Sequence, residues 1–127
     1  MIVVDASAAV LALLDDGDAR SRLGQDALAA PHLADAEVMS SLRRLVAAGS
    51  LEVVVAEQAI RTWASLGIER LAITGVLDRV WELRANLTAY DAAYVALAET
   101  LDCTLLTADA RLATAPGPRC PVTIVRS

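Results

Sequence analysis

IVVDASA, at residues 2–8, carries the strongest local indication of the fold class. Three apolar β-branched residues in a row predict a short buried strand that ends at Asp5. Residues 6–14 follow with apolar side chains at helical spacing and stop at Asp15-Asp16-Gly17. A buried strand that runs directly into a helix indicates an α/β fold, which predicts further strand–helix units along the chain.

The remaining sequence repeats this alternation. We predict helices over 20–28, 33–48, 57–66, 76–84 and 88–101, a short helical segment over 109–113, and strands over 71–73, 103–107 and 122–125. In the helix over 76–84, Leu77, Val80, Trp81 and Leu83 are expected to face inward. Residues 51–55 are apolar and fit either a strand or the start of a helix. The pattern predicts one domain over residues 1–127, a three-layer α/β/α fold with a central, mainly parallel sheet.

Composition excludes several classes of protein. The chain has 127 residues, of which 56% are hydrophobic and 21% charged, so it is not intrinsically disordered. No apolar run approaches the roughly 18 residues of a membrane span, and the first residues lack the basic region of a signal peptide. Cys103 and Cys120 fit neither a disulfide framework nor a zinc-binding spacing. We therefore expect a cytoplasmic protein.

The charge balance limits the chemistry. There are 16 acidic residues against 11 basic ones, all of them arginine, for a net charge of −5. The absence of lysine excludes mechanisms that need one. The acidic excess argues against a basic surface that wraps nucleic acid. It leaves room for a nucleic-acid enzyme whose acidic site holds divalent cations, because bound metal reverses the local field.

Four acidic residues are placed where a site can form. Asp5 and Asp109 follow predicted strands, Asp91 lies in the first turn of a long helix, and Glu37 lies near the start of another. Sites of parallel sheets form at the carboxyl ends of the strands, so the four carboxylates are expected to converge there. Such a cluster needs cations to offset repulsion, and oxygen ligands suit Mg²⁺ or Mn²⁺. These ions support phosphodiester hydrolysis by an activated water.

Each of these residues also has a purely structural interpretation. Asp5 and Asp109 fit helix N-caps, Thr88-x-x-Asp91 fits a capping box, and Glu37 fits an ordinary solvated charge. The Arg43-Arg44 pair fits either a phosphate contact or a solvated helix face. These alternatives remain open from the residues alone.

Four segments resemble the PIN domain, and more specifically the VapC toxins of bacterial toxin–antitoxin pairs. They are IVVDASA (2–8), PHLADAEVMSSLRRL (31–45), LTAYDAAYVALAE (87–99) and LLTADARLA (105–113), in the family's order and spacing from Ile2 to Ile124. The motif around Tyr90-Asp91, together with Leu106-Thr107-x-Asp109, is the most specific part of the match.

The resemblance implies a function and a set of site residues. The family is a metal-dependent ribonuclease fold, and its acids match Asp5, Glu37, Asp91 and Asp109 here, with Mg²⁺ or Mn²⁺ as cofactor. Asp5 and Asp91 match its best metal ligands. Ser7 and Thr107 match hydroxyl positions of relatives. Ser40 departs from the family, which often has asparagine at that position.

The resemblance also implies partners: an RNA substrate, a second copy of the chain in a homodimer, and a cognate, VapB-like antitoxin encoded nearby that forms a hetero-oligomer with the toxin. An acidic pocket suits an arginine from such an antitoxin, since a guanidinium bridges carboxylates.

Two other classes of function fit parts of the sequence. A phosphotransfer module of the response-regulator kind has a similar length and layout, but it uses a strand-end lysine that this chain lacks. A catalytically silent PIN-like domain that only binds partners is the second. The presence of all four acids argues against it.

Overall fold

A five-stranded parallel sheet forms the centre of the computed structural model, which describes residues 1–126. The strands are β1 (Ile2–Val4), β2 (Leu28–Pro31), β3 (Ile68–Leu71), β4 (Thr104–Thr107) and β5 (Val122–Ile124). Their order across the sheet is β3-β2-β1-β4-β5, and every pair is parallel. The predicted fold class is confirmed.

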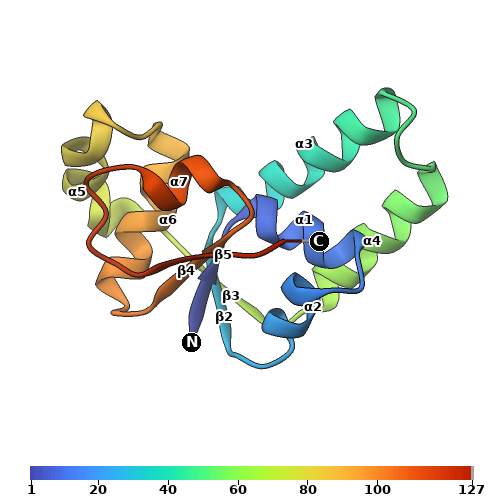
Figure 1. Ribbon diagram of the computed structural model, residues 1–127, viewed down its shortest axis with the longest axis horizontal. Helices are drawn as coiled ribbons and strands as arrows, with labels where there is room; N and C mark the ends of the chain where they lie inside the picture. Colours follow the sequence, from blue (N-terminus) through green and yellow to red (C-terminus); the bar gives the residue numbers. More distant parts are fainter. Residues whose placement is uncertain (127) are drawn as a thin grey trace.

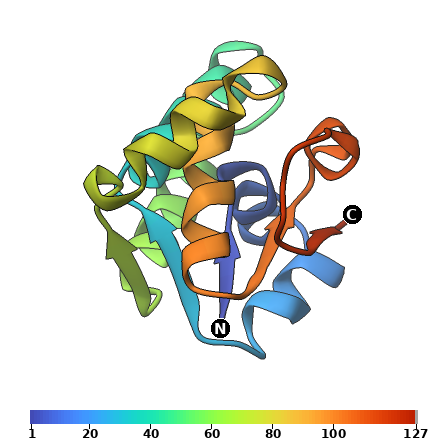
Figure 2. The same ribbon diagram turned by 90° about the vertical axis from the view of Figure 1, so that its left-hand side faces the viewer.

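Helices cover both faces of this sheet. They are α1 (Ala6–Leu14), α2 (Asp18–Leu23), α3 (Leu33–Ala47), α4 (Val53–Ser65), α5 (Leu77–Glu82), α6 (Ala89–Thr100) and α7 (Ala110–Thr114), with 3₁₀ turns η1 (Thr74–Val76) and η2 (Leu83–Ala85). One face carries α5 and α6, and the other carries α1 to α4, of which α3 and α4 extend away from the sheet (Figure 1). Seen from the side, α6 lies across the middle of the sheet and α7 lies near its β5 edge (Figure 2).

The core is centred on β1 and α6. Val3 and Val4 of β1 are fully buried. So are four alanines of α6: Ala92, Ala93, Ala96 and Ala98. These short side chains let the helix backbone lie close to the strands, which places residues of its first turns at the carboxyl edge of the sheet.

The end of α3 shows how local sequence fixes an element. Gly49 adopts a φ of 74°, the left-handed region that glycine enters without steric penalty. Its N–H donates to the Val46 carbonyl, and the N–H of Ser50 donates to that of Leu45. This is a Schellman motif, and it turns the chain from α3 back into α4.

Several predicted boundaries are wrong. Leu28–Pro31 is an inner strand, although the helix predicted over 20–28 covered its first residue; alanine and proline are poor strand formers, so this segment carried no strand pattern. The third strand is Ile68–Leu71 instead of 71–73, and the ambiguous 51–55 begins α4.

Of the four residues predicted to face inward in the segment over 76–84, two do so and two do not. Leu83 is buried and Val80 packs against the core, but Leu77 and Trp81 are exposed, Trp81 by 67%. The Arg84 guanidinium stacks on the Trp81 ring, 4.5 Å from its centroid. No helix in the described part of the chain has the length and apolar character needed to cross a membrane.

Candidate active site

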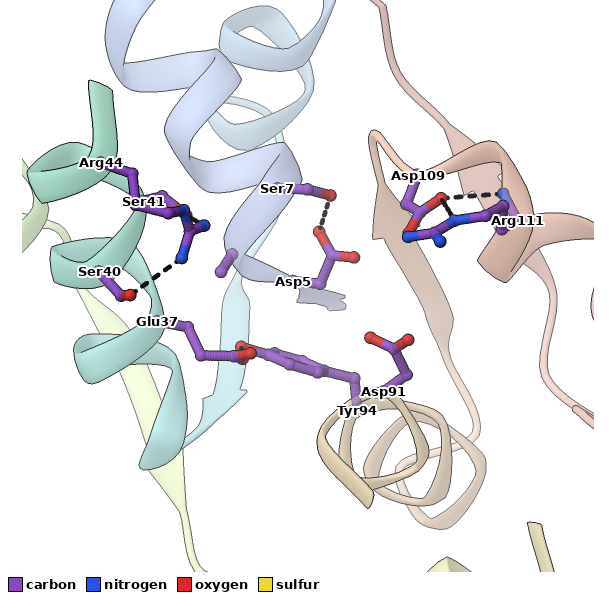
Figure 3. A pocket seen from close by; sticks show the side chains of 11 residues that line it. Asp5, Ser7, Glu37, Ser40, Ser41, Arg44, Asp91, Tyr94, Asp109 and Arg111 are labelled. Atoms are coloured by element: carbon purple, nitrogen blue, oxygen red, sulfur yellow. Dashed lines mark hydrogen bonds and ion pairs between the residues drawn. The ribbon is translucent and has the colours of Figure 1, made fainter. Parts of the chain in front are cut away.

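The four predicted acids line one pocket at the carboxyl edge of the sheet. Its volume is about 350 Å³, and its walls come from Asp5 just after β1, from α1, α3 and α6, and from the start of α7 after β4. The lining residues are Asp5, Ala6, Ser7, Glu37, Ser40, Ser41, Arg44, Asp91, Tyr94, Asp109 and Arg111 (Figure 3). The expected convergence of the four carboxylates on one pocket is therefore present.

Asp5 is the most buried of these acids, with 5% of its surface exposed. Its Oδ1 accepts hydrogen bonds from the Ser7 hydroxyl at 2.6 Å and the Ala8 N–H at 2.9 Å, and its Oδ2 accepts one from Thr107 at 2.5 Å. Burial is the largest influence on its pKa, which lies above the ordinary value, while these hydrogen bonds act in the opposite direction. Asp5 is thus both the N-cap of α1 and a wall of the pocket.

Ser7 and Thr107 have a clear structural role. Ser7 Oγ also accepts the Ala108 N–H at 2.9 Å, and Thr107 Oγ1 accepts the Asp109 N–H at 3.0 Å. Both hydroxyls therefore connect the end of β1 to the segment after β4. They hold the Asp5 carboxylate in place and fix the start of the segment that carries Asp109.

Glu37 and Asp91 face the pocket from the two helical layers (Figure 3). The Glu37 carboxylate accepts a 2.6 Å hydrogen bond from the Tyr94 hydroxyl. Asp91 lies in the first turn of α6, where its N–H donates to the Thr88 hydroxyl at 3.2 Å. Burial raises the pKa of both carboxyls, and negative charge nearby adds to it: Asp91 and Asp5 for Glu37, Asp109 for Asp91.

Asp109 is held differently. It caps α7 by accepting the Arg111 N–H at 2.9 Å, and the Arg111 guanidinium contacts both of its carboxylate oxygens, at 3.3 and 3.2 Å. This pairing lowers the pKa of Asp109 below its ordinary value. The predicted capping roles of Asp5 and Asp109 are therefore real, and both residues line the pocket as well.

Comparison with known proteins identifies the family. Residues 2–118 match the PIN domain family. Ribonuclease VapC9 of Mycobacterium tuberculosis is 50% identical over 125 residues, which cover 98% of each chain. Ribonuclease VapC1 of the same organism is 43% identical over 129 residues, covering 98% of this chain and 97% of that one.

The chain belongs to the VapC ribonuclease family of PIN domain proteins. A solved structure agrees with this PIN fold: VapBC2 from Rickettsia felis, bound to a DNA fragment from its promoter, matches with a TM-score of 0.71. That match is 14% identical and covers 98% of both chains, so it supports the fold alone. Membership of the PIN family removes the phosphotransfer alternative.

The PIN pocket has the donor chemistry for a hard divalent cation, although its carboxylates are not gathered as ligands. Four carboxylates face two guanidiniums, which leaves an excess of negative charge. In the part of the chain that the structure describes, no group of three or more Asp, Glu, His or Cys side chains is close enough to hold a metal ion. Glu37 is bound to Tyr94 and Asp109 to Arg111, so these two carboxylates are held by protein groups.

Sequence reasoning missed the supporting residues of the pocket. Tyr94 entered it only as part of a motif, although its place three residues after Asp91 on α6 puts both side chains on one helix face. Arg111 and Ser41 were not singled out at all. The hydrogen bonds of Ser40 and Ser41 to Arg44, at 3.0 and 3.2 Å, had no signal beyond helical spacing.

Proposed function

We propose that this protein is a metal-dependent endoribonuclease and the toxin of a toxin–antitoxin pair. The observation that carries the proposal is the convergence of Asp5, Glu37, Asp91 and Asp109 on one pocket in a VapC-family chain. The substrate is RNA, and the reaction is hydrolysis of its phosphodiester bonds. The relatives named above support this activity, because both are ribonucleases by name.

Asp5 and Asp91 would be the principal ligands of the cation, Mg²⁺ or Mn²⁺, with Glu37 and Asp109, which Tyr94 and Arg111 hold, beside them. When bound, such an ion lowers the pKa of water and stabilises negative charge on the phosphate oxygens. The raised pKa values of Asp5, Glu37 and Asp91 support this assignment. They arise because burial and neighbouring negative charges disfavour the ionised carboxylates, and a bound cation would offset both effects.

Water, and not a side chain, is the proposed nucleophile. Ser7 carries the first hydroxyl after β1, but this hydroxyl donates to Asp5 and accepts from Ala108. Both hydrogen bonds hold it in a structural role, so it is not the proposed nucleophile. Neither His32 nor the two cysteines line the pocket. The chain's own contribution is to position carboxylates: Ser7 and Thr107 orient Asp5, and Tyr94 orients Glu37.

The proposed partners follow from the family and from the charge of the pocket. We propose a VapB-like antitoxin, a homodimer, and action in the cytoplasm. The Rickettsia felis structure of the same fold is VapBC2 with a DNA fragment from its promoter, and it is the precedent for a partner of this kind. The excess of carboxylates in the pocket suits an arginine from the antitoxin, which would neutralise it.

Cleavage of RNA tests the proposal. Purified wild type, Asp5→Asn and Asp91→Asn are incubated with RNA in Mg²⁺, Mn²⁺ or a chelator, and products are mapped by sequencing their ends. Wild type should cleave only with the divalent ions, and both variants should lose most activity. Asp78→Asn, an exposed acid on α5 away from the pocket, is the matched control and should retain it.

A cellular measurement tests the toxin role. Wild type should arrest growth when expressed alone and not when the neighbouring antitoxin gene is co-expressed, whereas Asp5→Asn should be harmless. Wild-type rates in both Asp5→Asn and Asp91→Asn would contradict the site, and a wild type inert on RNA would indicate a silent partner-binding domain.

A further inference from the structure

Arg44 is a cation aimed at the acidic pocket without a carboxylate partner. It lies on α3 and lines the pocket, where its guanidinium donates to the hydroxyls of Ser40 and Ser41. Within residues 1–126, no carboxylate lies within ion-pair distance of it, whereas Arg70, Arg79 and Arg111 are all paired. Two neutral hydroxyls orient the guanidinium, and its charge acts on Glu37 only from beyond ion-pair distance, where it lowers the pKa of that carboxyl.

The position of Arg44 matters because RNA must approach a negative pocket. Four carboxylates line that pocket, and a phosphate backbone entering it meets repulsion from them. Arg44 stands on the α3 wall and Arg111 on the opposite side, with the acids between them (Figure 3). Because Arg111 is engaged by Asp109, Arg44 is the lining cation that has no carboxylate partner in the described residues.

We propose that Arg44 binds the RNA backbone at a phosphate next to the one that is cleaved, and that Ser40 and Ser41 orient it for this contact. The inference rests on the proposed ribonuclease function and adds a substrate-binding residue to its site. A guanidinium offers two parallel N–H donors to phosphate oxygens, so the contact fixes orientation as well as charge.

The chain supplies a matched control one residue away. Arg43 carries the same charge on the same helix, but it lines a separate apolar groove between α3 and α4, with Met39, Val46 and Ile60. Arg43→Gln and Arg44→Gln therefore change net charge equally, and both residues are exposed, so both variants should fold. Only the second removes a cation from the acidic pocket.

Binding is measured on the Asp5→Asn chain in chelator, with a fluorescein-labelled oligoribonucleotide of random sequence followed by fluorescence anisotropy. Arg44→Gln should weaken RNA binding about tenfold, the effect of one charge-assisted contact. It should also reduce the slope of log affinity against log salt by about 0.7, the value for one phosphate contact to a single strand. Arg43→Gln should change affinity less than about twofold, since an exposed charge outside the site is screened.

Ser40→Ala with Ser41→Ala tests the orienting role. The double alanine variant should weaken RNA binding by itself but add nothing once Arg44 is glutamine, because it acts through that side chain. Additive effects would overturn this part of the proposal.

Three results would overturn the Arg44 contact: equal losses in Arg44→Gln and Arg43→Gln, no measurable RNA binding by the parent chain, or unchanged RNA affinity in Arg44→Gln with weakened antitoxin binding. RNA integrity is checked after each titration. Cleavage by the Asp5→Asn chain would contradict the proposed function separately, so the two failures are distinguishable.

Discussion

The Tyr94 hydroxyl donates a 2.6 Å hydrogen bond to Glu37 Oε1, which joins α6 to α3 across 57 positions of the sequence. Tyr94 is 2% exposed, and its pKa is raised by burial and by the Glu37 charge, so it stays protonated and remains a donor. The same bond opposes the effect of burial on the pKa of Glu37. Tyr94 thus holds Glu37 at the pocket and favours its ionised form.

Tyr94→Phe should raise the pKa of Glu37 further, because the hydrogen bond that lowers it is lost while burial remains. NMR titration of the Glu37 carboxyl in metal-free protein measures this. The free energy of unfolding should fall by about 1 kcal/mol, as for one lost hydrogen bond. Tyr90→Phe, on the same helix but 63% exposed, is the control and should leave both quantities unchanged. An unmoved Glu37 titration in Tyr94→Phe would show that the bond does not exist in solution.

Asp5→Asn should stabilise the metal-free protein at neutral pH by a fraction of a kcal/mol up to roughly 1–2 kcal/mol. The pKa of Asp5 in the folded protein lies above 3.8, its ordinary value. Between these two values the native state keeps a proton on Asp5 that the unfolded chain has released. Wild type therefore loses stability relative to Asp5→Asn as pH rises from 3.8 through the raised value, and below 3.8 the difference is constant.

Asp5→Ala separates this charge effect from helix capping. Asparagine still caps α1 by accepting the Ala8 N–H, whereas alanine cannot, so Asp5→Ala should be less stable than Asp5→Asn by about 1 kcal/mol. Urea unfolding across pH with chelator present measures both differences. A stability of Asp5→Asn below wild type at every pH would mean that the loss of a carboxylate acceptor, such as the one that Thr107 donates to, outweighs the relief of burial and repulsion.

Arg111→Gln should tighten divalent-cation binding, by no more than about fivefold. The Arg111 guanidinium occupies both oxygens of Asp109 and adds positive charge to the pocket, so its removal frees a carboxylate and lowers repulsion toward a cation. Calorimetric titration with Mn²⁺ measures the change. Arg84→Gln, whose guanidinium stacks on Trp81, removes the same charge elsewhere and should have no effect. Weaker binding in Arg111→Gln would show that Arg111 supports the cation instead of competing with it.

Asp35→Asn should lower stability by about 1 kcal/mol without abolishing RNA cleavage at low temperature. Asp35 accepts the Trp63 indole N–H at 2.8 Å and the Arg70 guanidinium at 2.9 Å, so it fastens α3 to α4 and β3. Arg70 holds its pKa below 3.8, so this stabilisation is present above pH 3.8 and is lost as pH falls through the lowered value. The pair is partly exposed, 26% for the Arg70 side chain and 45% for that of Asp35, and solvent screening therefore reduces its effect. Thermal melts against Asp78→Asn, with cleavage assays of the same samples, check both parts.

Local sequence patterns predict an element correctly where the propensity of its own residues matches the structure that tertiary packing requires. Ile2–Val4 is β-branched and buried throughout, and Thr88 caps α6 as its spacing indicates, so both boundaries were right. The strand Leu28–Pro31 was not predicted, because its own residues have low strand propensity. Pairing with β1 and β3 on either side determines its conformation. Trp81 was expected inside, but on the short helix α5 its side chain is exposed and stacks with Arg84.

In the candidate site, too, some features could be predicted from the sequence and others could not. Asp5 and Asp109 follow strands, so topology alone predicts that they meet at one edge of the sheet. The orientation of the carboxylates depends on partners far away in sequence, such as Thr107 for Asp5 and Tyr94 for Glu37. No periodicity within one element reports such contacts, because they exist only after the layers have packed.

The most direct test of the account is Mn²⁺ binding by titration calorimetry, on wild type, Asp5→Asn, Asp91→Asn and the control Asp78→Asn. We expect wild type and Asp78→Asn to bind with the same affinity and each pocket variant to bind about tenfold or more weakly, because a ligand carboxylate is lost. Equal affinity in all four proteins, or no binding by wild type, would contradict the assignment of this pocket as the cation site of a metal-dependent ribonuclease.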